Sequence, residues 1–373
     1  SSPVLALTGD NDRSFRGNEA IQDADNRAIL DPHTSNSWDP ETPERAIQAL
    51  ENAITEAVTG VPGPTHVNLP EDLLDEPVPD RADSPVSATY PASRPEPEAE
   101  TVTAITDALA DASQPVIVAG EGALRSRAWG EIGDLADTAA IPVVTSMNGK
   151  GVVDEREPYA LGVAGRWGFA EPANETLAES DLVLALGARL GELTSNRYSL
   201  IPDEATLIQV DLDPEWLGRI YTPDIPVLAD IRATVEGITA SLGPDPRSGR
   251  SEYLANRAEA YTEWRESIRE ELTADATPVH PARIVGELEE TLPPESTVVS
   301  ATSFPGFFSA AYYLVRDPGI RYLQARGSDG INYALPQALG VQLAAPDRPV
   351  VAVSGDGGIG YHIADIETAV REP

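Results

Sequence analysis

One stretch near the end of the chain, residues 349–372 (PVVAVSGDGGIGYHIADIETAVRE), restricts the fold more than any other. The continuous apolar run 350–353 is typical of a buried strand in a parallel sheet. A glycine-rich turn, 354–358, follows this run, and apolar residues then recur at helical spacing, at Ile363, Ile366 and Val370. A strand, a glycine turn and a helix in this order predict an α/β fold.

The glycine turn itself has two interpretations. Glycines let the backbone approach a phosphate closely, and the first N–H groups of the following helix have no partner within that helix. Asp356 adds a hard carboxylate oxygen, which suits an Mg²⁺ ion that bridges diphosphate oxygens. Most such turns in α/β proteins only reverse the chain, so the turn alone leaves both interpretations open.

The segment before the turn carries further motifs. Residues 332–336 are NYALP, Ala338 and Gly340 follow, and the GDG of 355–357 comes after the next strand. In this order and spacing, residues 325–358 resemble the diphosphate domain of thiamine-diphosphate enzymes of the acetolactate synthase and benzoylformate decarboxylase type. The resemblance extends through almost the whole chain, and it implies thiamine diphosphate and Mg²⁺ as cofactors.

The resemblance also implies roles for individual residues. The diphosphate and the metal would be anchored by Gly355, Asp356, Gly357 and Gly358, with Asp356 as the metal ligand. Ile331 falls at the position of the bulky aliphatic side chain that holds the cofactor bent, and it is the expected catalytic residue. The remaining cofactor-binding positions are Gly330, Asn332, Tyr333 and Ser303. Asn332 stands where relatives usually have glycine, and Ser303 lies in a turn that keeps none of the family's GQH-like loop.

Composition limits the remaining choices. A chain of 373 residues is long enough for two or three domains. It has no cysteine, which excludes disulfides and thiolate chemistry. No apolar run approaches the roughly 20 residues that span a bilayer, and no signal peptide is visible. We therefore expect a soluble, cytoplasmic protein that has no membrane partner.

The formal net charge of −35 is extreme, and Lys150 is the single lysine of the chain. Acidic residues are spread along the whole sequence, which argues against nucleic acid as a partner, because phosphate backbones attract positive surfaces. At about 1 M salt the Debye length is only about 3 Å, so the self-repulsion of such a protein is screened. The charge therefore predicts the protein of a halophile.

Strands that alternate with helices predict three-layer α/β domains with parallel sheets. Motifs at 17–23 (GNEAIQD) and 60–64 (GVPGP) resemble the end of the family's pyrimidine domain. Between them, 42–58 predicts a helix capped by Thr42, with one apolar face made of Ala46, Ile47, Leu50, Ile54 and Val58. At the end of the following strand we expect local hydrogen-bond partners for His66 and Asn68.

The same resemblance divides the chain into domains. The expected order is a partial pyrimidine domain at 1–80, a linker at 81–98, a central Rossmann-like domain at 99–242, a linker at 243–252 and a C-terminally incomplete diphosphate domain at 253–373.

The central domain raises the question of a second cofactor. Gly120 and Gly122 follow a strand, but position 125 is arginine, where the GxGxxG dinucleotide motif has its third glycine. In this family the central domain binds flavin in acetolactate synthases and is empty in many relatives. The chain keeps Arg189 of the family's flavin stretch and lacks its aspartates. FAD is therefore a candidate cofactor, and a purely structural domain is the alternative.

Two parts of the family pattern are missing from this sequence. One is the glutamate that activates the pyrimidine ring of the cofactor, and the other is the Asn-Asn pair that closes the metal motif. We expect the sequence to be a fragment of a longer enzyme, inactive by itself, or else a degenerate gene product.

The function implied by the resemblance is the thiamine-diphosphate- and Mg²⁺-dependent decarboxylation and carboligation of 2-keto acids, in which pyruvate is decarboxylated and condensed with a second keto acid. Such a transferase serves branched-chain amino acid biosynthesis. It works as a homo-oligomer, a dimer or tetramer, with the site at the subunit interface. One alternative is a benzoylformate-type decarboxylase. Another is a non-catalytic remnant that binds partner subunits.

Overall fold

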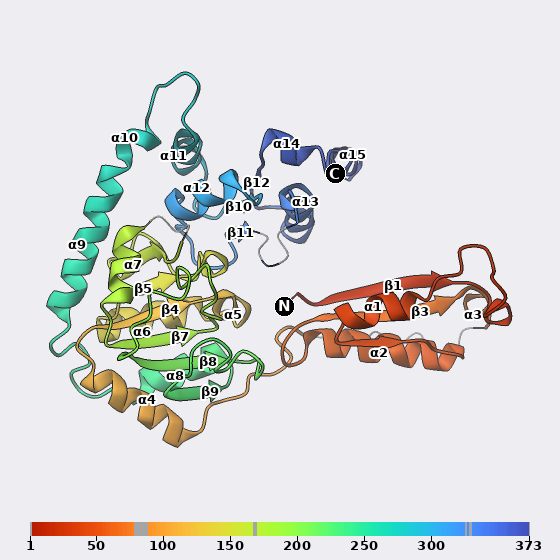
Figure 1. The fold of residues 1–373 in the computed structure, drawn as a ribbon, viewed down its shortest axis with the longest axis horizontal. Helices are drawn as coiled ribbons and strands as arrows, with labels where there is room; N and C mark the ends of the chain where they lie inside the picture. Colours follow the sequence, from red (N-terminus) through yellow and green to blue (C-terminus); the bar gives the residue numbers. More distant parts are fainter. Residues whose placement is uncertain (1, 78–88, 167–169, 325–326, 328–329, 373) are drawn as a thin grey trace. The chain divides into compact units, whose positions relative to one another are not determined.

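The structure, a computed structural model, describes residues 2–77, 89–166, 170–324, 327 and 330–372. Contacts divide it into two compact units, Ser1–Arg94 and Pro95–Pro373 (Figure 1). Part of the first predicted linker, 81–88, and four residues of the motif segment, 325–326 and 328–329, lie outside the described residues. None of the described helices combines the length and the apolarity that crossing a lipid bilayer requires.

The first unit is built on a three-stranded parallel sheet of order β1-β3-β2. Val4 pairs with Pro64 and the register continues to Asp10 and Pro70. The strands and helices of this unit are β1 (Val4–Asp10), η1 (Arg13–Phe15), α1 (Asn26–Leu30), η2 (Asp31–His33), β2 (Asn36–Trp38), α2 (Pro43–Val58), β3 (Pro64–Pro70) and α3 (Glu71–Leu74).

Helix α2 begins as the sequence predicts, but its fully buried residues are not those of the predicted apolar face. The hydroxyl of Thr42 accepts a hydrogen bond from the Arg45 N–H at 3.4 Å, which makes Thr42 the N-cap. The five residues of the predicted face are half-buried, and Leu50 packs against the core of this unit. The buried residues are instead the alanines that follow each other at four-residue spacing, Ala49, Ala53 and Ala57. Small side chains let the helix approach the sheet closely, and the larger residues flank this line.

The second unit contains two separate parallel sheets. The larger one has the order β6-β5-β4-β7-β8-β9, which is 3-2-1-4-5-6 when its strands are numbered along the chain. This is the strand order of dinucleotide-binding folds. Its strands and helices are α4 (Ala99–Asp111), β4 (Pro115–Ala119), α5 (Glu121–Arg125), α6 (Trp129–Ala139), β5 (Val143–Thr145), η4 (Met147–Gly149), β6 (Ala160–Val163), α7 (Glu171–Ala178), β7 (Leu182–Leu186), β8 (Thr206–Asp211), β9 (Ile225–Leu228) and α8 (Ile231–Ser241).

The alternation of side chains along β4 gives this sheet its two covered faces. Ile117 packs on the face covered by α4, α6 and α8. Val116 and Val118 pack on the opposite face, together with residues of α7 and with Tyr261. The strand is buried on both sides, as its continuous apolar sequence predicts. Strand β9, which pairs with β8, forms the last strand of this sheet.

The smaller sheet of the second unit has the order β11-β10-β12. Helices α11 and α12 cover one of its faces and α13 covers the other, so this part also has three layers. Its elements are α9 (Ser251–Ser267), α10 (Arg269–Leu272), α11 (Pro281–Thr291), β10 (Thr297–Ser300), α12 (Phe304–Tyr312), β11 (Tyr322–Gln324), α13 (Ala334–Ala344), β12 (Val350–Val353), α14 (Asp356–Ile359) and α15 (Asp365–Arg371).

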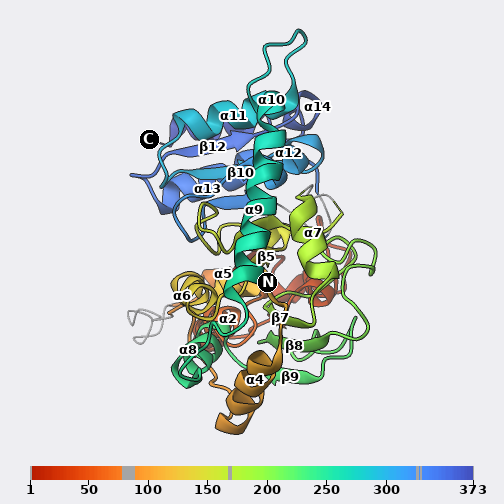
Figure 2. The same cartoon turned by 90° about the vertical axis from the view of Figure 1, so that its left-hand side faces the viewer.

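Helix α9 runs past both sheets of the second unit and connects them in sequence (Figure 2). Residues 243–250, predicted to be part of a linker, are held against helix α4 by Arg250, which is buried. Its guanidinium donates hydrogen bonds to the carbonyl oxygens of Leu109, in α4, and of Pro246. This part of the predicted linker is therefore anchored to a helix that covers the larger sheet.

Strand β12 is parallel to β10, as predicted, but it is not buried. It lies at an edge of the smaller sheet, and its residues are half-buried, with Ala352 exposed. The single helix expected after it is divided into α14 and α15. The apolar residues of that expected helix, Ile363, Ile366 and Val370, are exposed. A local apolar pattern predicts which elements form, but burial depends on which neighbours cover them.

Candidate functional site

The candidate site lies where the strands of the smaller sheet end. All strand pairs of this sheet are parallel, so the segments that follow β10, β11 and β12 leave from the same edge. Ligands of α/β proteins bind at this carboxyl edge. The segment after β12 contains the glycine turn, the segment after β10 contains Ser303, and the segment after β11 leads to Asn332 and α13.

The glycine turn is shorter than the sequence suggests, because α14 begins inside it. Gly355 is the residue before the helix, and its carbonyl oxygen accepts the hydrogen bond of Ile359 N–H at 3.0 Å. Asp356, Gly357 and Gly358 therefore form the first helical turn, whose N–H groups have no partners within a helix. The side chain of Asp356 is exposed, and a Cβ atom placed on Gly357 would meet no atom within 4 Å. The turn is open on the side of Gly357.

Asn332 closes the other side of the turn. A Cβ atom on Gly358 would lie 3.2 Å from the Asn332 Cβ, so the asparagine occupies the space that a side chain at 358 would take. The hydroxyl of Ser354 donates a hydrogen bond of 2.7 Å to Asn332 Oδ1. Asn332 is only 1% exposed and has a left-handed backbone, with φ of 57°. The structure thus joins Asn332 to the turn that follows β12.

The neighbours of Asn332 point outward. Ile331 is 50% exposed and Tyr333 is 49% exposed, so neither belongs to the core. The Tyr333 ring lies 5.6 Å from the ring of His362, measured between centroids. Gly330 is required next to Tyr333, because a Cβ atom there would come within 1.8 Å of the tyrosine ring. Ile331 and Tyr333 are therefore accessible to a ligand that lies along this edge.

Ser303 has a backbone conformation that only glycine adopts easily. Its φ is 76° and its ψ is −150°, and it stands immediately before α12 with no side-chain capping bond. Such a conformation costs on the order of 1–3 kcal/mol for a residue with a side chain. The first turn of α12 lies next to the glycine turn, because a Cβ atom on Gly355 would lie 4.0 Å from Pro305 Cγ. The structure thus places the two segments side by side.

The donor set fits a diphosphate with a magnesium ion. In the described part of the chain, no group of three or more His, Asp or Glu side chains could hold a metal. Asp356 can therefore supply one carboxylate ligand, while Mg²⁺ takes its other oxygen ligands from phosphate groups and water. The open first turn of α14 offers N–H groups to the phosphate oxygens. The buried amide of Asn332 lies against this turn and retains an unpartnered nitrogen within the described residues.

Among the described residues, the centre of the larger sheet offers no comparable open turn. Its two middle strands, β4 and β7, end in glycine turns that contact each other, and the Gly122 N–H donates a hydrogen bond of 3.1 Å to the Gly187 oxygen. A Cβ atom on Gly120 would lie 2.1 Å from the same oxygen. The carboxylate of Glu121, in the first turn of α5, is paired with Arg125 at 2.8 Å. The backbone contact therefore does not fit a dinucleotide diphosphate placed between these two turns.

Two arginines near the carboxyl ends of β7 and β8 stack on a tryptophan of the same chain. After β8, Trp216 lies between the guanidinium groups of Arg189 and Arg219, at 4.1 and 4.5 Å from its ring centroid. Arg189 is the residue of the family's flavin-binding stretch that the sequence analysis found in this chain. Its contact with Trp216 gives it a cation–π role within the chain.

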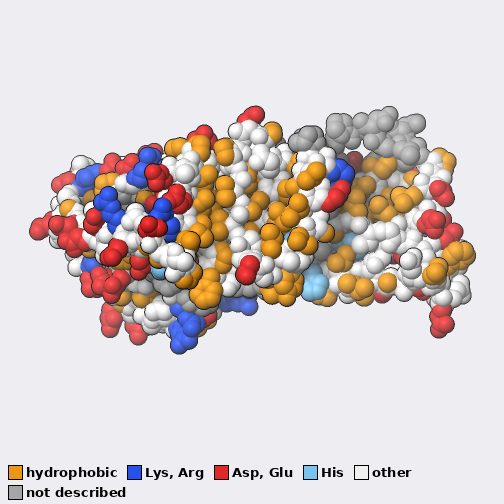
Figure 3. Space-filling view, turned by 90° about the horizontal axis from the view of Figure 1, so that it is seen from above, with side chains coloured by type: hydrophobic (Ala, Val, Ile, Leu, Met, Phe, Trp, Pro, Cys, Tyr) orange, Lys and Arg blue, Asp and Glu red, His pale blue; other side chains and the backbone are white. Residues whose placement is uncertain are grey.

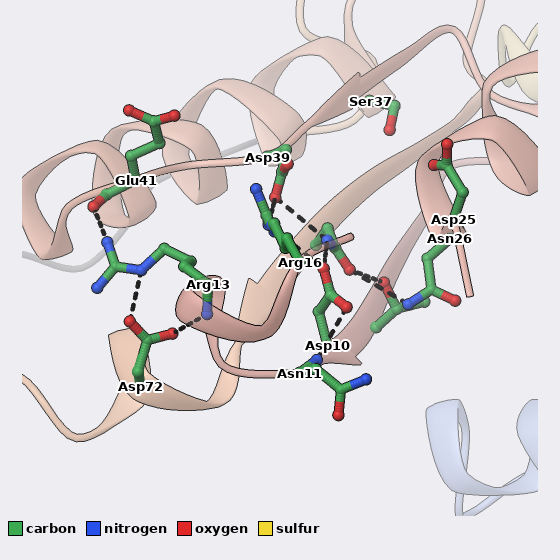
Figure 4. A network of polar contacts seen from close by, with 12 residues as sticks. Asp10, Asn11, Arg13, Arg16, Asp25, Asn26, Ser37, Asp39, Glu41 and Asp72 are labelled. Atoms are coloured by element: carbon green, nitrogen blue, oxygen red, sulfur yellow. Dashed lines mark hydrogen bonds and ion pairs between the residues drawn. The ribbon is translucent and has the colours of Figure 1, made fainter. Parts of the chain in front are cut away.

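Sequence reading missed a polar cluster in the first unit, at the carboxyl ends of its three strands (Figure 4). Arg16 bridges Asp10 and Asp39, at 3.3 and 2.9 Å. Asn68 donates hydrogen bonds to the same two carboxylates, at 2.9 and 3.2 Å. The signal in the sequence was an acidic residue at the end of each of two strands, Asp10 as the last residue of β1 and Asp39 directly after β2. Arg16 and Asn68 each contact both carboxylates, so the groups of this cluster are partners of one another.

His66 is hydrogen-bonded, as expected, but its partners are remote in sequence and not local. It is fully buried, and its two ring nitrogens lie 2.8 Å from the Thr8 hydroxyl and 2.7 Å from the Ser37 hydroxyl. Burial lowers the pKa of the His66 imidazole below its ordinary value, although Asp31 and Asp39 oppose this shift. His66 is thus a neutral structural residue that joins the three strands of the first sheet.

Comparison with known proteins gives two family matches. Residues 102–238 match the model described as "Thiamine pyrophosphate enzyme, central domain". Residues 306–373 match the model described as "Thiamine pyrophosphate enzyme, C-terminal TPP binding domain". The second match contains α13, β12 and the glycine turn of the candidate site.

Similar curated proteins carry the name acetolactate synthase. The "Probable acetolactate synthase large subunit" of Methanocaldococcus jannaschii is 28% identical over 383 residues, which cover 99% of this chain and 63% of that protein. The "Acetolactate synthase isozyme 3 large subunit" of Escherichia coli K12 is 27% identical over 381 residues, covering 100% of this chain and 65% of that protein. The "Acetolactate synthase" of Mycobacterium leprae is 27% identical and is covered to 57%. The chain thus spans less than two thirds of the length of these relatives.

Proposed function

The chain belongs to the thiamine pyrophosphate enzyme family, and from this premise we propose that it takes part in thiamine-diphosphate- and Mg²⁺-dependent decarboxylation and carboligation of 2-keto acids, as in acetolactate synthase. The observation that carries the proposal is the open first turn of α14, with Asp356 exposed beside it, at the carboxyl edge of a parallel sheet. When bound, thiamine diphosphate supplies a carbon nucleophile for the keto group and an electron sink after CO₂ leaves.

The residues of this chain would hold the cofactor in three ways. The Asp356 carboxylate ligates the magnesium ion, and the N–H groups of Asp356, Gly357 and Gly358 face the phosphate oxygens. The exposed side chain of Ile331 supports the cofactor from below, which fixes its bent shape. Ser303, next to Gly355 through Pro305, offers its backbone or hydroxyl group to the diphosphate from the side of α12.

We keep the benzoylformate-type decarboxylase as a second candidate, because NYALP at 332–336 and GVQLA at 340–344 match that branch. The two candidates differ in the fate of the carbon fragment that remains after CO₂ is lost. A carboligase joins the fragment to a second keto acid, whereas a decarboxylase releases an aldehyde. Product analysis with pyruvate as the substrate separates them, since acetolactate supports the first candidate and acetaldehyde supports the second.

We also propose that the site is completed by a second copy of the chain. Figure 3 shows acidic side chains gathered on the side of α9–α11, while hydrophobic side chains spread over the face that carries α12–α14. Exposed apolar residues of this region are Phe304, Ile331, Leu343, Tyr361, Ile363, Ile366 and Val370. A surface of this kind is typical of a protein–protein interface. A monomer mass in light scattering at molar KCl would contradict the proposal.

The central domain, by contrast, is proposed to act without flavin. The two glycine turns that would hold a dinucleotide diphosphate between them are already in backbone contact. Flavin that copurifies with the chain, seen by its visible absorption, would overturn this proposal.

The proposed cofactor site is tested by titration calorimetry of the chain with thiamine diphosphate, with and without Mg²⁺, in molar KCl. We expect binding that requires the metal and that weakens at least about tenfold in Asp356→Asn, because a metal ligand is lost. Asp347→Asn is the matched control, since it removes the same charge from an exposed loop at the other end of β12. Equal affinity in Asp356→Asn and the wild type, or equal loss in both variants, would contradict the proposed site.

A further inference from the structure

Asn332 carries an unpaired hydrogen-bond donor in a buried position. Its side-chain Nδ2 has no hydrogen-bond partner among the described residues, although the residue is only 1% exposed. Buried polar groups in folded proteins are nearly always paired, since an unpaired donor has lost its water without gaining a partner. An exception of this kind calls for a partner other than the described residues of the chain.

Two contacts place the amide of Asn332 beside the glycine turn. The Ser354 hydroxyl donates to Oδ1 at 2.7 Å, which holds the carbonyl side of the amide toward β12. The side chain also fills the space beside Gly358, where an added Cβ would lie 3.2 Å from Asn332 Cβ and 3.6 Å from Cγ. The amide therefore lies against the first turn of α14, within the segment that would receive a phosphate.

We propose that Asn332 Nδ2 donates a hydrogen bond to a phosphate oxygen of the diphosphate bound at the first turn of α14. The inference rests on the proposed cofactor site, and it adds the side chain of Asn332 to the groups that bind the diphosphate there. It also gives a reason for asparagine at a position of positive φ, because asparagine tolerates this conformation better than other residues that carry a polar side chain.

The Asn332 amide could face the site with its nitrogen, as a hydrogen-bond donor, or with its oxygen, as a metal ligand, and the two orientations predict opposite effects of an aspartate at this position. If the amide were reversed, its oxygen would face the site and would ligate Mg²⁺, and a carboxylate would then serve better than the amide. A carboxylate that faces phosphate oxygens would repel them instead. The variant Asn332→Asp, which keeps the shape of the side chain, therefore distinguishes the two arrangements.

The test is titration calorimetry of thiamine diphosphate and of inorganic diphosphate, each with Mg²⁺, into the full chain. Asn332→Gly removes the amide without backbone strain, since glycine accepts a φ of 57°. We expect about tenfold weaker binding of both ligands in this variant, as for the loss of one hydrogen bond to a charged acceptor. Asn332→Asp should bind more weakly still. Unphosphorylated thiamine should show no difference among the three proteins.

Two further variants serve as controls. Gln337→Met removes an amide from the following helix, α13. The Oε1 of this half-buried residue is buried and also lacks a partner among the described residues, and the variant should not change diphosphate affinity. Ser354→Ala removes the hydroxyl group that orients the Asn332 amide. It should weaken diphosphate binding less than Asn332→Gly does. The double variant should bind no more weakly than Asn332→Gly alone, because both changes act on the same hydrogen bond. Circular dichroism confirms that each variant is folded.

The outcomes separate this inference from the function on which it rests. Wild-type binding that needs Mg²⁺ and Asp356 but is unchanged in Asn332→Gly would overturn the inference alone. Tighter binding by Asn332→Asp would also overturn it, because the residue would then be a metal ligand. A wild-type chain that is folded but binds neither ligand would overturn both the inference and the proposed cofactor site.

Discussion

Single residues of this chain have roles that their types do not reveal. Asn332 and Ser354 form a hydrogen bond across 22 positions of sequence, and His66 joins strands through two hydroxyl groups. Capping residues are different, because their partners lie within one helical turn. The capping role of Thr42 could be predicted from the sequence. His280 has the same kind of local partner, since its Nδ1 accepts a hydrogen bond from the Ala282 N–H at the start of α11. Pairing between residues that are remote in sequence could not be predicted, because it depends on the fold.

His66 gives the stability of the chain a dependence on pH. Its pKa is lowered in the folded state, so between that value and about 6.5 the unfolded state binds more protons than the folded state. The contribution of the neutral imidazole is therefore complete above about pH 6.5 and is lost as the pH falls below it. We expect the urea midpoint of the transition that includes the first unit to fall between about pH 6.5 and pH 5.

The control for this prediction is His66→Gln, which keeps a neutral polar side chain and cannot titrate. Its urea midpoint should be lower than that of the wild type at pH 7.5, because one hydrogen bond is lost. It should fall less steeply than the wild type between pH 6.5 and 5. An identical slope in the two proteins would show that His66 does not cause the pH dependence.

At the scale of elements, the loop after β5 contains a buried ion pair, and one member of the pair, Glu155, docks the loop on the segment after α12. Lys150 donates hydrogen bonds to both carboxylate oxygens of Glu155, at 2.8 and 2.7 Å, and both residues are buried. Glu155 also accepts a hydrogen bond from the Val315 N–H at 2.7 Å, and its own N–H donates to the Val315 oxygen at 2.9 Å. Nearby, Arg265 pairs with Glu289, which accepts from the Leu314 N–H.

We predict that Lys150→Met destabilises the chain strongly, by about 3–5 kcal/mol, because it leaves the buried Glu155 carboxylate uncompensated. The double variant Lys150→Met with Glu155→Leu should recover much of this loss, since no buried charge remains. Urea unfolding of the single and double variants measures both effects. A loss of less than about 1 kcal/mol in Lys150→Met would contradict the role given to this ion pair.

The elements themselves show where sequence reasoning succeeds. Strands β4 and β7 have continuous apolar sequences, and the structure gives them the predicted bounds and burial. Strand β12 has the same kind of sequence but lies at a sheet edge, and the helix after it is interrupted at Gly360. An apolar run predicts a strand, whereas its burial is set by neighbours that are remote in sequence. In the same way, the contact between Gly122 and Gly187 depends on strand order and could not be read from either motif alone.

For the whole molecule, net charge is the property that follows most directly from the sequence. The net charge is −35, and the single lysine is buried beside Glu155, so the described exposed cations are arginines. We retain the proposal of adaptation to high salt, because screening at about 1 M salt reduces repulsion among surface carboxylates but acts little on a buried pair. An unfolding midpoint that does not rise with KCl concentration would contradict it.

The central claim, that the first turn of α14 receives the diphosphate of the cofactor, is tested most directly by hydrogen–deuterium exchange. The full chain is measured at about 1 M KCl, where repulsion is screened, with and without saturating thiamine diphosphate and Mg²⁺. We predict slower exchange of the amides in residues 354–360 and 330–336, and no change in 120–125. Unchanged exchange in 354–360, or protection confined to 120–125, would contradict the claim.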